Sequence, residues 1–215
     1  MKITQLIVAL VALSSTPSFA GILQLKGGSK QISGVQISEG GKMVVEGRTT
    51  ELNSVGAGLR KRMSLFSVYV GELLVNDSRG YVCKRNEALG SIKNLNGIAM
   101  RLVFLRAIGM SDLEKAFTDG IDNNNLNPND ADMKKFLAAI RAGGDIPNGS
   151  TLAFTGEKLA DGSEAVTYEN AKKQAVTIKG GAGFVHNVFA LWLGNGGSDG
   201  GLNSLIENLT TCKFE

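Results

Sequence analysis

NSVGAGLR, residues 53–60, is the stretch of sequence that constrains this chain most. Alternate side chains of a β-strand share one face, so Gly56, Gly58 and Arg60 would point to the same side. The two glycines leave that face without side-chain bulk, and Arg60 would project beyond them with a planar guanidinium. We predict a groove that binds a carboxylate, a phenolate or an enolate beside an apolar group. The alternative is a glycine bulge with Arg60 in solvent.

The segments around this stretch predict a β-sheet. Residues 51–62 and 63–75 are expected to form one long extended stretch, of which 65–75 is apolar on both faces. A central strand that is covered on both sides has this pattern. Further strands and one turn, at residues 39–42, follow from alternation and from Gly, Asn and Asp pairs. These strands are expected at residues 31–37, 43–45, 97–105, 151–155, 164–168 and 174–178.

Helices are expected in two blocks. Ser111 begins a capping box as its N-cap, and Pro128 would occupy the first turn of a second helix that ends at 143–144. Residues 184–193 are apolar on nearly every side, which predicts a buried helix before a short last one at 199–209. The order of strands, helices, strands and again helices indicates an α+β fold, in which a mainly antiparallel sheet packs against a layer of helices.

The first 20 residues have the pattern of a secretory signal peptide. Lys2 precedes an apolar run, residues 6–13, that is too short to span a bilayer, and small residues permit cleavage after Ala20. We therefore predict a periplasmic or secreted protein whose single domain comprises residues 21–215, with no membrane span once the signal is removed. An uncleaved anchor or a buried N-terminal helix is the alternative.

Charge, cysteine and histidine content argue against several kinds of site. The formal net charge of +3 is too small for the strongly basic face that nucleic-acid binding requires. Cys83 and Cys212 favour a disulfide in an exported chain, with two buried free thiols as the alternative. Neither cysteine has metal-ligand spacing, and residues 122–132 lack the Gly and Glu of a calcium loop, so no metal or cofactor is expected. The only histidine, His186, is expected to be a hydrogen-bonded core or rim residue rather than a base.

Three segments resemble the chalcone isomerase family, in particular its bacterial members. Gly-Ala-Gly-Leu-Arg at residues 56–60, followed by Val-Tyr-Val at 68–70, looks like the family's signature, in which an arginine follows Gly-x-Gly. Residues 100–123 resemble the family's strand-then-helix segment. Residues 184–209, which contain Trp-Leu-Gly, are similar to its C-terminal stretch. The resemblance covers roughly residues 45–210.

The resemblance implies an open-faced sheet under a layer of helices, with a ligand cleft between them. In plant enzymes of the family, this cleft closes a chalcone into a flavanone. The arginine orients the substrate and stabilises the enolate charge that develops. Other members of the fold bind fatty acids and have no isomerase activity.

The family's site residues are only partly present at the matching positions. Arg60 matches the arginine, and Ser67 falls near a hydroxyl-bearing Thr of the family. The family's active-site Tyr has no counterpart among residues 110–113, and a second Thr is replaced by Leu191. Tyr69 is expected to line the core or the cleft, with its hydroxyl near Arg60.

Two functions follow as hypotheses. In the first, the chain is an exported binding protein for an apolar acid, such as a fatty acid, or for a phenolic compound, held by Gly56, Gly58 and Arg60. In the second, it is an isomerase or intramolecular lyase of the chalcone isomerase type that acts on an unidentified substrate. Arg60 would then be the catalytic group that stabilises charge, and Ser67 or Tyr69 would position the substrate or a water. A structural or partner-binding role is a third possibility.

Overall fold

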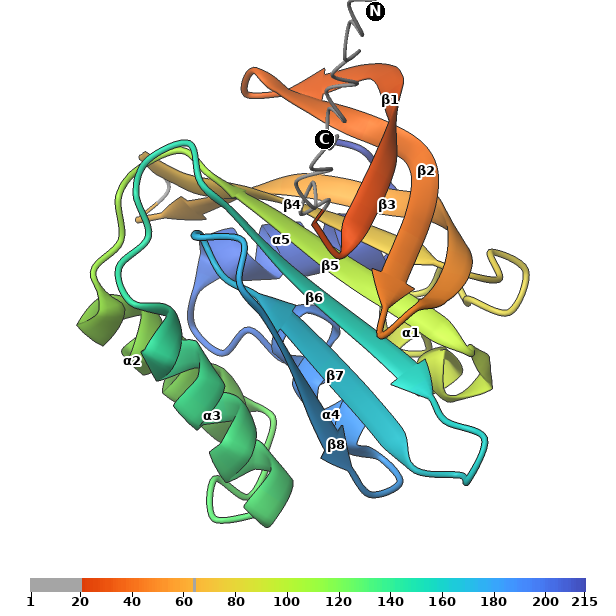
Figure 1. The fold of residues 1–215 in the computed structure, drawn as a ribbon. Coiled ribbons are helices and arrows are strands. Elements are labelled where there is room, and N and C mark those ends of the chain that lie inside the picture. The colour runs from red at the N-terminus through yellow and green to blue at the C-terminus, as the bar shows by residue number, and fades with distance from the viewer. Residues whose placement is uncertain (1–20, 64) are drawn as a thin grey trace, which may run out of the picture.

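The computed structural model describes residues 21–63 and 65–215, so the expected signal peptide lies outside the described residues. These residues form one eight-stranded sheet whose strands follow each other in chain order, each antiparallel to the next (Figure 1). The strands are β1 (Leu23–Ile32), β2 (Val35–Val45), β3 (Arg48–Arg62), β4 (Phe66–Val75), β5 (Gly97–Phe104), β6 (Thr151–Lys158), β7 (Glu164–Glu169) and β8 (Ala175–Gly180). The helices are α1 (Ala88–Ser91), the short 3₁₀ helix η1 (Ile92–Asn94), α2 (Met110–Asn123), α3 (Ala131–Gly143), α4 (Phe184–Leu193) and α5 (Gly200–Thr210). The predicted α+β fold with an antiparallel sheet is confirmed.

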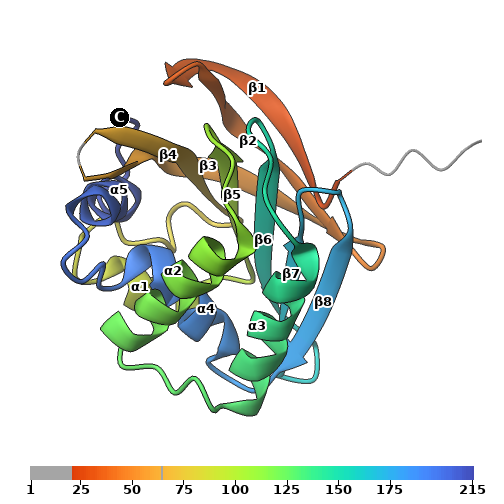
Figure 2. The same cartoon turned by 90° about the vertical axis from the view of Figure 1, so that its left-hand side faces the viewer.

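The helices lie on one face of the sheet and share a single core with it (Figure 2). Helix α4 is the centre of this layer, because it contacts α1, α2, α3, α5 and β7. Eight of its residues are buried, as its apolar sequence predicts. Its Trp192 packs against the rings of Phe117 and Phe154, with centroids 5.9 and 4.8 Å away.

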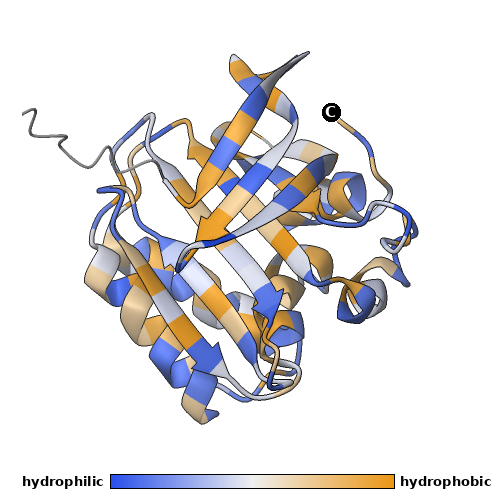
Figure 3. Ribbon diagram, turned by 45° about the vertical axis from the view of Figure 1, so that its right-hand side comes forward, coloured by the Kyte–Doolittle hydropathy of each residue, from blue (hydrophilic) through white to orange (hydrophobic). Residues whose placement is uncertain are grey.

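The other face of the sheet is partly covered by the sheet itself, because β1 and β2 curve back over it (Figure 1). Ile37 of β2 packs there against Ala57 of β3 and Val70 of β4. Strand β4 is therefore buried on both faces, which confirms the prediction for a central strand. Hydrophobic and hydrophilic bands alternate along several strands in Figure 3, as expected for a sheet with two different faces.

The turn that was expected at residues 39–42 is wrong, because β2 continues through it. Gly40 and Gly41 have φ angles of 149° and 157°. A Cβ atom at either position would lie 2.3 Å from a backbone oxygen of a neighbouring strand. These glycines therefore permit a close approach of backbones inside a strand rather than a reversal of the chain.

Two segments that were expected to be continuous contain reversals. Residues 31–37 turn at Ser33 and Gly34, whose φ angles of 48° and 81° suit a tight hairpin, so β1 was largely missed. The expected single stretch over residues 51–75 reverses between Arg62 and Phe66, and its two halves pair as β3 and β4. No Gly, Pro, Asn or Asp lies between Gly58 and Gly71, so the strongest turn signals are missing at this hairpin.

The expected N-cap of the first long helix is wrong by two residues. Helix α2 begins at Met110 with Gly109 as its N-cap, so Ser111 lies in the first turn. The N–H group of Met110 donates to the carboxylate of Asp145 at 2.7 Å, which supplies the acceptor that Ser111 was expected to provide.

The second expected helix start is also wrong, because Pro128 precedes the helix. Helix α3 begins at Ala131, and the carboxylate of Asp130 accepts hydrogen bonds from the backbone N–H groups of Asp132 and Met133. The side-chain cap that Asp130 provides, rather than Pro128, therefore determines where this helix starts.

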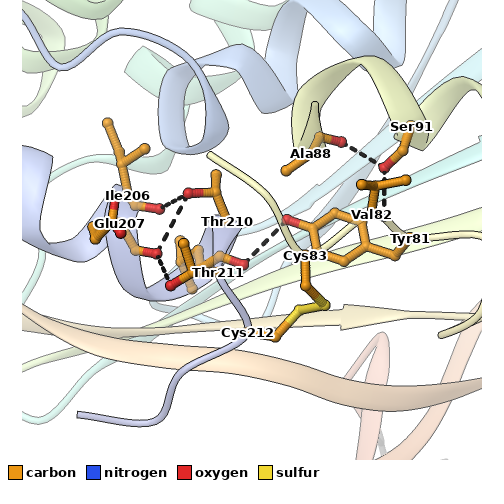
Figure 4. The surroundings of a disulfide bond; sticks show 11 residues. Tyr81, Val82, Cys83, Ala88, Ser91, Ile206, Glu207, Thr210, Thr211 and Cys212 are labelled. Carbon is orange, nitrogen blue, oxygen red and sulfur yellow. Dashed lines mark hydrogen bonds between the residues drawn. A yellow bond between two sulfur atoms is a disulfide. The ribbon is translucent and has the colours of Figure 1, made fainter. Parts of the chain in front are cut away.

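A disulfide joins Cys83 to Cys212, which lie 129 positions apart in the sequence and have Cα atoms 5.4 Å apart (Figure 4). Beside it, the Tyr81 hydroxyl donates a hydrogen bond to the Leu209 carbonyl oxygen at 3.1 Å. Both contacts hold the end of α5 against the segment that follows β4. In the part of the chain that the structure describes, no helix has the length and apolar character needed to cross a membrane.

Candidate functional site

Gly56 and Gly58 lie under helix α5 rather than on the floor of a ligand groove. A Cβ atom at Gly56 would lie 3.0 Å from the Asn208 carbonyl oxygen and 3.1 Å from the Cα atom of Leu209. At Gly58 it would lie 2.8 Å from the side-chain nitrogen of Asn208. The predicted role of both glycines in ligand binding is therefore wrong: they let a helix approach β3 closely.

Arg60 continues the same face of β3, just beyond the point where α5 begins. Its Nη2 atom donates to the Oδ2 atom of Asp199 at 2.7 Å. Asp199 is also the N-cap of α5, since its Oδ1 atom accepts from the Leu202 N–H at 3.0 Å. The Arg60 side chain is 17% exposed and that of Asp199 is 32% exposed. Arg60 is therefore neither free in solvent nor sealed in the core.

A cavity of about 600 Å³, here called the hollow, opens beside this ion pair. It lies between α2, the segment from α4 to α5, and the adjoining ends of β3, β4 and β5. Its lining combines basic, acidic and apolar side chains. The lining comprises Arg60, Arg62, Val68, Tyr69, Phe104, Arg106, Ala107, Ile108, Asp112, Leu113, Lys115, Ala116, Asp119, Gly120, Asp122, Asn123, Gly196, Ser198, Asp199 and Leu202.

A smaller cavity of about 50 Å³, here called the recess, shares the inner wall of the hollow. Apart from Arg60 and Tyr69, its lining side chains are apolar. The lining comprises Arg60, Tyr69, Leu102, Phe104, Leu113, Ala116, Phe117, Gly120, Leu191, Trp192 and Leu202. Arg60 and Tyr69 line both cavities, so they mark the boundary between a polar opening and an apolar interior.

Tyr69 and Arg60 are direct cross-strand partners, and the guanidinium carbon lies 5.6 Å from the centre of the Tyr69 ring. The Tyr69 ring in turn packs against Phe104 with centroids 5.3 Å apart. A cation over an aromatic face is favourable, and here it also fixes the direction of the guanidinium. The Nε atom of Arg60 is buried and has no hydrogen-bond partner among the described residues.

The contacts around Arg60 shift three pKa values. Burial acts to raise the pKa of Asp199, but hydrogen bonds from Arg60 and from the Leu202 N–H hold it below its ordinary value. Burial acts to lower the pKa of Arg60, and Tyr69 and Asp199 outweigh it, so this pKa is raised. Burial raises the pKa of Tyr69. At neutral pH the site therefore presents a guanidinium, a carboxylate and an uncharged phenol.

Two other predicted residues lie outside this site. Ser67 is absent from the described lining of both the hollow and the recess, and it pairs with Lys61 across the β3–β4 ladder. His186 lines a separate cavity of about 450 Å³ near Lys93 and Glu164. The structure therefore does not bring Ser67 or His186 to Arg60. Among the residues of known placement, no cluster of His, Cys, Asp or Glu has the arrangement of a metal site.

Sequence reasoning missed Asp199 as the partner of Arg60. The residue was expected only as the start of the last helix. Its position before an apolar run indicates an N-cap, but nothing local indicates a contact 139 positions away. The apolar wall that α2 contributes, through Leu113 and Ala116, was likewise visible only as a helical stripe.

A comparison with known proteins places this chain in a family. The model of the chalcone isomerase-like family matches residues 29–206. No match was found among curated proteins. Among solved structures, the chain is similar to the crystal structure of a fatty-acid binding protein from Arabidopsis thaliana, with 15% sequence identity and a TM-score of 0.49. That alignment covers 79% of this chain and 96% of the other. Because the family match spans well over half of its residues, this chain belongs to the chalcone isomerase-like family.

Proposed function

We propose that the hollow binds a small apolar molecule with an anionic group, such as a carboxylate or a phenolate, and that Arg60 holds the anion. Family membership supports ligand binding only in general terms. The single observation that carries the specific proposal is the position of Arg60 at the boundary between the hollow and the apolar recess. An amphipathic ligand matches that boundary, because its charged end and its apolar end need different surroundings.

Arg60 retains donors for such a ligand. Among the described residues, its side chain makes one hydrogen bond, to Asp199, whereas a guanidinium has five N–H donors. A hydrogen bond between charged groups contributes roughly 1.5–3 kcal/mol. The negative charge of Asp199 repels a second anion, so the Arg60 guanidinium would contact Asp199 and the ligand anion at the same time. This competition predicts modest affinity and a preference for ligands whose apolar part is well buried.

The small recess sets a limit on the apolar part. At about 50 Å³ it holds only a short group, so a longer tail must lie along the walls of the hollow. Leu113 and Ala116 of α2 and Leu202 of α5 line both cavities and supply those walls. Ligands with a compact ring or a short chain are therefore expected to fit better than long saturated chains.

Export is part of this proposal. The signal-like pattern of residues 1–20 supports it, and so does the disulfide, since such bonds persist in oxidising compartments. Expression of the full chain with analysis of the periplasm and the medium provides the test. The intact mass of the recovered protein should correspond to an N-terminus at Gly21 with the disulfide formed. Recovery of the full-length chain in the cytosol would contradict export.

The binding proposal is tested with purified residues 21–215 and a panel of fatty acids and phenolic acids. Thermal shifts and titration calorimetry should detect binding to the wild type and a loss of about tenfold in Arg60→Gln. Arg79→Gln is the matched control, because Arg79 is exposed in the loop after β4 and lines neither cavity. Equal binding by Arg60→Gln and the control would contradict the proposal.

The same proteins also separate binding from catalysis. A hydroxychalcone and other enones are followed by absorbance in the presence of each variant. We expect no turnover above the Arg60→Gln background. Turnover that Arg60→Gln abolishes would instead indicate an isomerase.

A further inference from the structure

The hairpin between β3 and β4 exposes an unusual concentration of apolar side chains. Met63 is 77% exposed, Leu65 is 78% exposed and Phe66 is 51% exposed. Only one other large hydrophobic residue in the described chain, Val176, is comparably exposed. Single exposed hydrophobic residues need no explanation, but three at one tip form an apolar patch of the kind that marks an interaction site.

Basic side chains flank this apolar tip. Lys61 and Arg62 are exposed at the end of β3, and the guanidinium of the exposed Arg106 lies 5.7 Å from the centre of the Phe66 ring. The sequence contains no Asp or Glu from residue 53 to residue 71. The tip therefore combines apolar groups with a local excess of positive charge, although the chain as a whole carries only +3.

The same hairpin forms one rim of the hollow. Arg62 and Val68 of the hairpin belong to its lining, and so does Arg106, which follows β5 and lies beside Phe66 of the hairpin. The acidic residues of that lining come from other elements, namely Asp112, Asp119 and Asp122 on α2 and Asp199 before α5. The lining residue Lys115 of α2 is basic but is paired with Asp119 at 2.8 Å. Positive charge is thus concentrated on the hairpin side of the opening.

We propose that this hairpin docks the protein on an anionic lipid bilayer, with Met63, Leu65 and Phe66 entering the interface. Lys61, Arg62 and Arg106 then contact the headgroups, since cationic side chains around an apolar anchor match an anionic surface. Docking itself does not depend on the ligand. The benefit of docking for ligand uptake rests on the proposed function: the opening of the hollow would face the bilayer, in which an apolar acid dissolves.

Sedimentation with lipid vesicles tests the docking, using residues 21–215 without added ligand. The wild type should bind vesicles of phosphatidylglycerol and phosphatidylcholine, and should bind pure phosphatidylcholine at least tenfold more weakly. Binding should also weaken as salt is raised from 0.05 to 0.5 M, because salt screens charges at a surface. The double variant Leu65→Ser/Phe66→Ser should bind about a hundredfold more weakly, since each apolar side chain removed from the interface costs roughly tenfold.

Val176→Ser is the control, because it removes an exposed apolar side chain far from the hairpin in sequence, on β8. Binding lost equally in this control, or retained in the double variant, would overturn the proposal. The proposal would also be overturned if the double variant lost vesicle binding only because it no longer self-associates. Light scattering of both proteins over a range of concentrations detects such self-association.

The two proposals fail separately. Arg60→Gln should reduce ligand affinity and leave vesicle binding unchanged, because Arg60 lies in the cavity wall. The hairpin double variant should lose vesicle binding and retain ligand affinity in solution. A protein that binds ligand but not vesicles would overturn docking alone.

Discussion

Two partly buried arginine–carboxylate pairs lie on opposite faces of the same sheet, and they differ in what surrounds them. On the helix face, Arg60 pairs with Asp199 beside open space. On the other face, the Nη2 atom of Arg101 lies 2.9 Å from the Oε2 atom of Glu72, which is fully buried. Each arginine has a buried Nε atom without a hydrogen-bond partner among the described residues. Unused donors therefore do not distinguish the two pairs.

Open space and the number of hydrogen bonds to the carboxylate distinguish them, although the Oε2 atom of Glu72 has only its ion contact with Arg101 among the described residues. The Oε1 atom of Glu72 accepts hydrogen bonds from the N–H and hydroxyl groups of Ser38 and from the hydroxyl of Ser54, and Arg101 also donates to the Gln36 carbonyl oxygen. A cavity of about 210 Å³ lies beside Ser38 and Ser54, but neither Glu72 nor Arg101 is among its lining residues. We infer that the Glu72 pair secures the curved β1–β2 hairpin, whereas the Arg60 pair is positioned for a ligand.

The largest effect on stability is expected from loss of the disulfide, which attaches the end of α5 on the helix face, where Arg60 and Asp199 lie. The double variant Cys83→Ser/Cys212→Ser should lose about 4 kcal/mol of unfolding free energy, because the bond closes a long loop of the unfolded chain. Denaturant unfolding measures this loss. A change below about 1 kcal/mol would show that α5 is held by its other contacts.

Glu72→Gln should cost about 3 kcal/mol, because it leaves the charge of Arg101 without its buried partner. The comparison requires that ligand affinity of the folded fraction stays unchanged. Unfolding curves and calorimetry on the same samples check both parts. If the variant kept wild-type stability but lost ligand binding, the roles assigned to the two faces would be reversed.

Gly56→Ala should cost about 2 kcal/mol, because the new methyl group would press on the backbone of α5 at Asn208 and Leu209. Gly90→Ala is the matched control, since no atom lies within 4 Å of its added Cβ. A thermal unfolding series compares the two variants. Equal stability would mean that α5 shifts without cost, and the structural role of Gly56 would be wrong.

Asp199→Asn should change stability by less than about 1 kcal/mol, because the pair is partly exposed and Asn is also a good N-cap. The pKa of Asp199 is depressed in the folded state, so the contribution of the carboxylate is present above pH ~4 and lost as pH falls further. The stability difference from wild type should therefore be constant at neutral pH and disappear in acid. Affinity for an anionic ligand should rise severalfold, and a fall would contradict competition at Arg60.

Sequence reasoning succeeded where the signal is local. The burial of α4 follows from its apolar composition. Arg60 and Tyr69 were expected near each other, but they meet across the β3–β4 hairpin, which sequence reasoning missed. Both expected helix starts, at Ser111 and Pro128, failed because Asp145 and Asp130 supplied other acceptors. Local sequence pattern shows that the N–H groups at a helix start need acceptors, but the fold of the whole chain determines which side chains accept from them.

Contacts between distant segments were beyond local pattern. Gly56 was assigned to a ligand groove because a missing side chain shows that something approaches, without showing whether it is a ligand or a helix. Glu72 was passed over within an apolar strand, since its partner Ser38 lies between an expected strand at residues 31–37 and an expected turn at 39–42. Asp199 was missed for the same reason, as 139 positions separate it from Arg60.

The central claim is that Arg60 recognises the charge of a ligand whose apolar part occupies the recess and the adjoining walls of the hollow. The most direct measurement compares the dissociation constants of octanoate and octanol for the wild type and for Arg60→Gln at neutral pH. We predict that the variant loses about tenfold for octanoate and less than twofold for octanol, since only the acid has a charge for the guanidinium. An equal loss for both ligands, or no loss for octanoate, would contradict the claim.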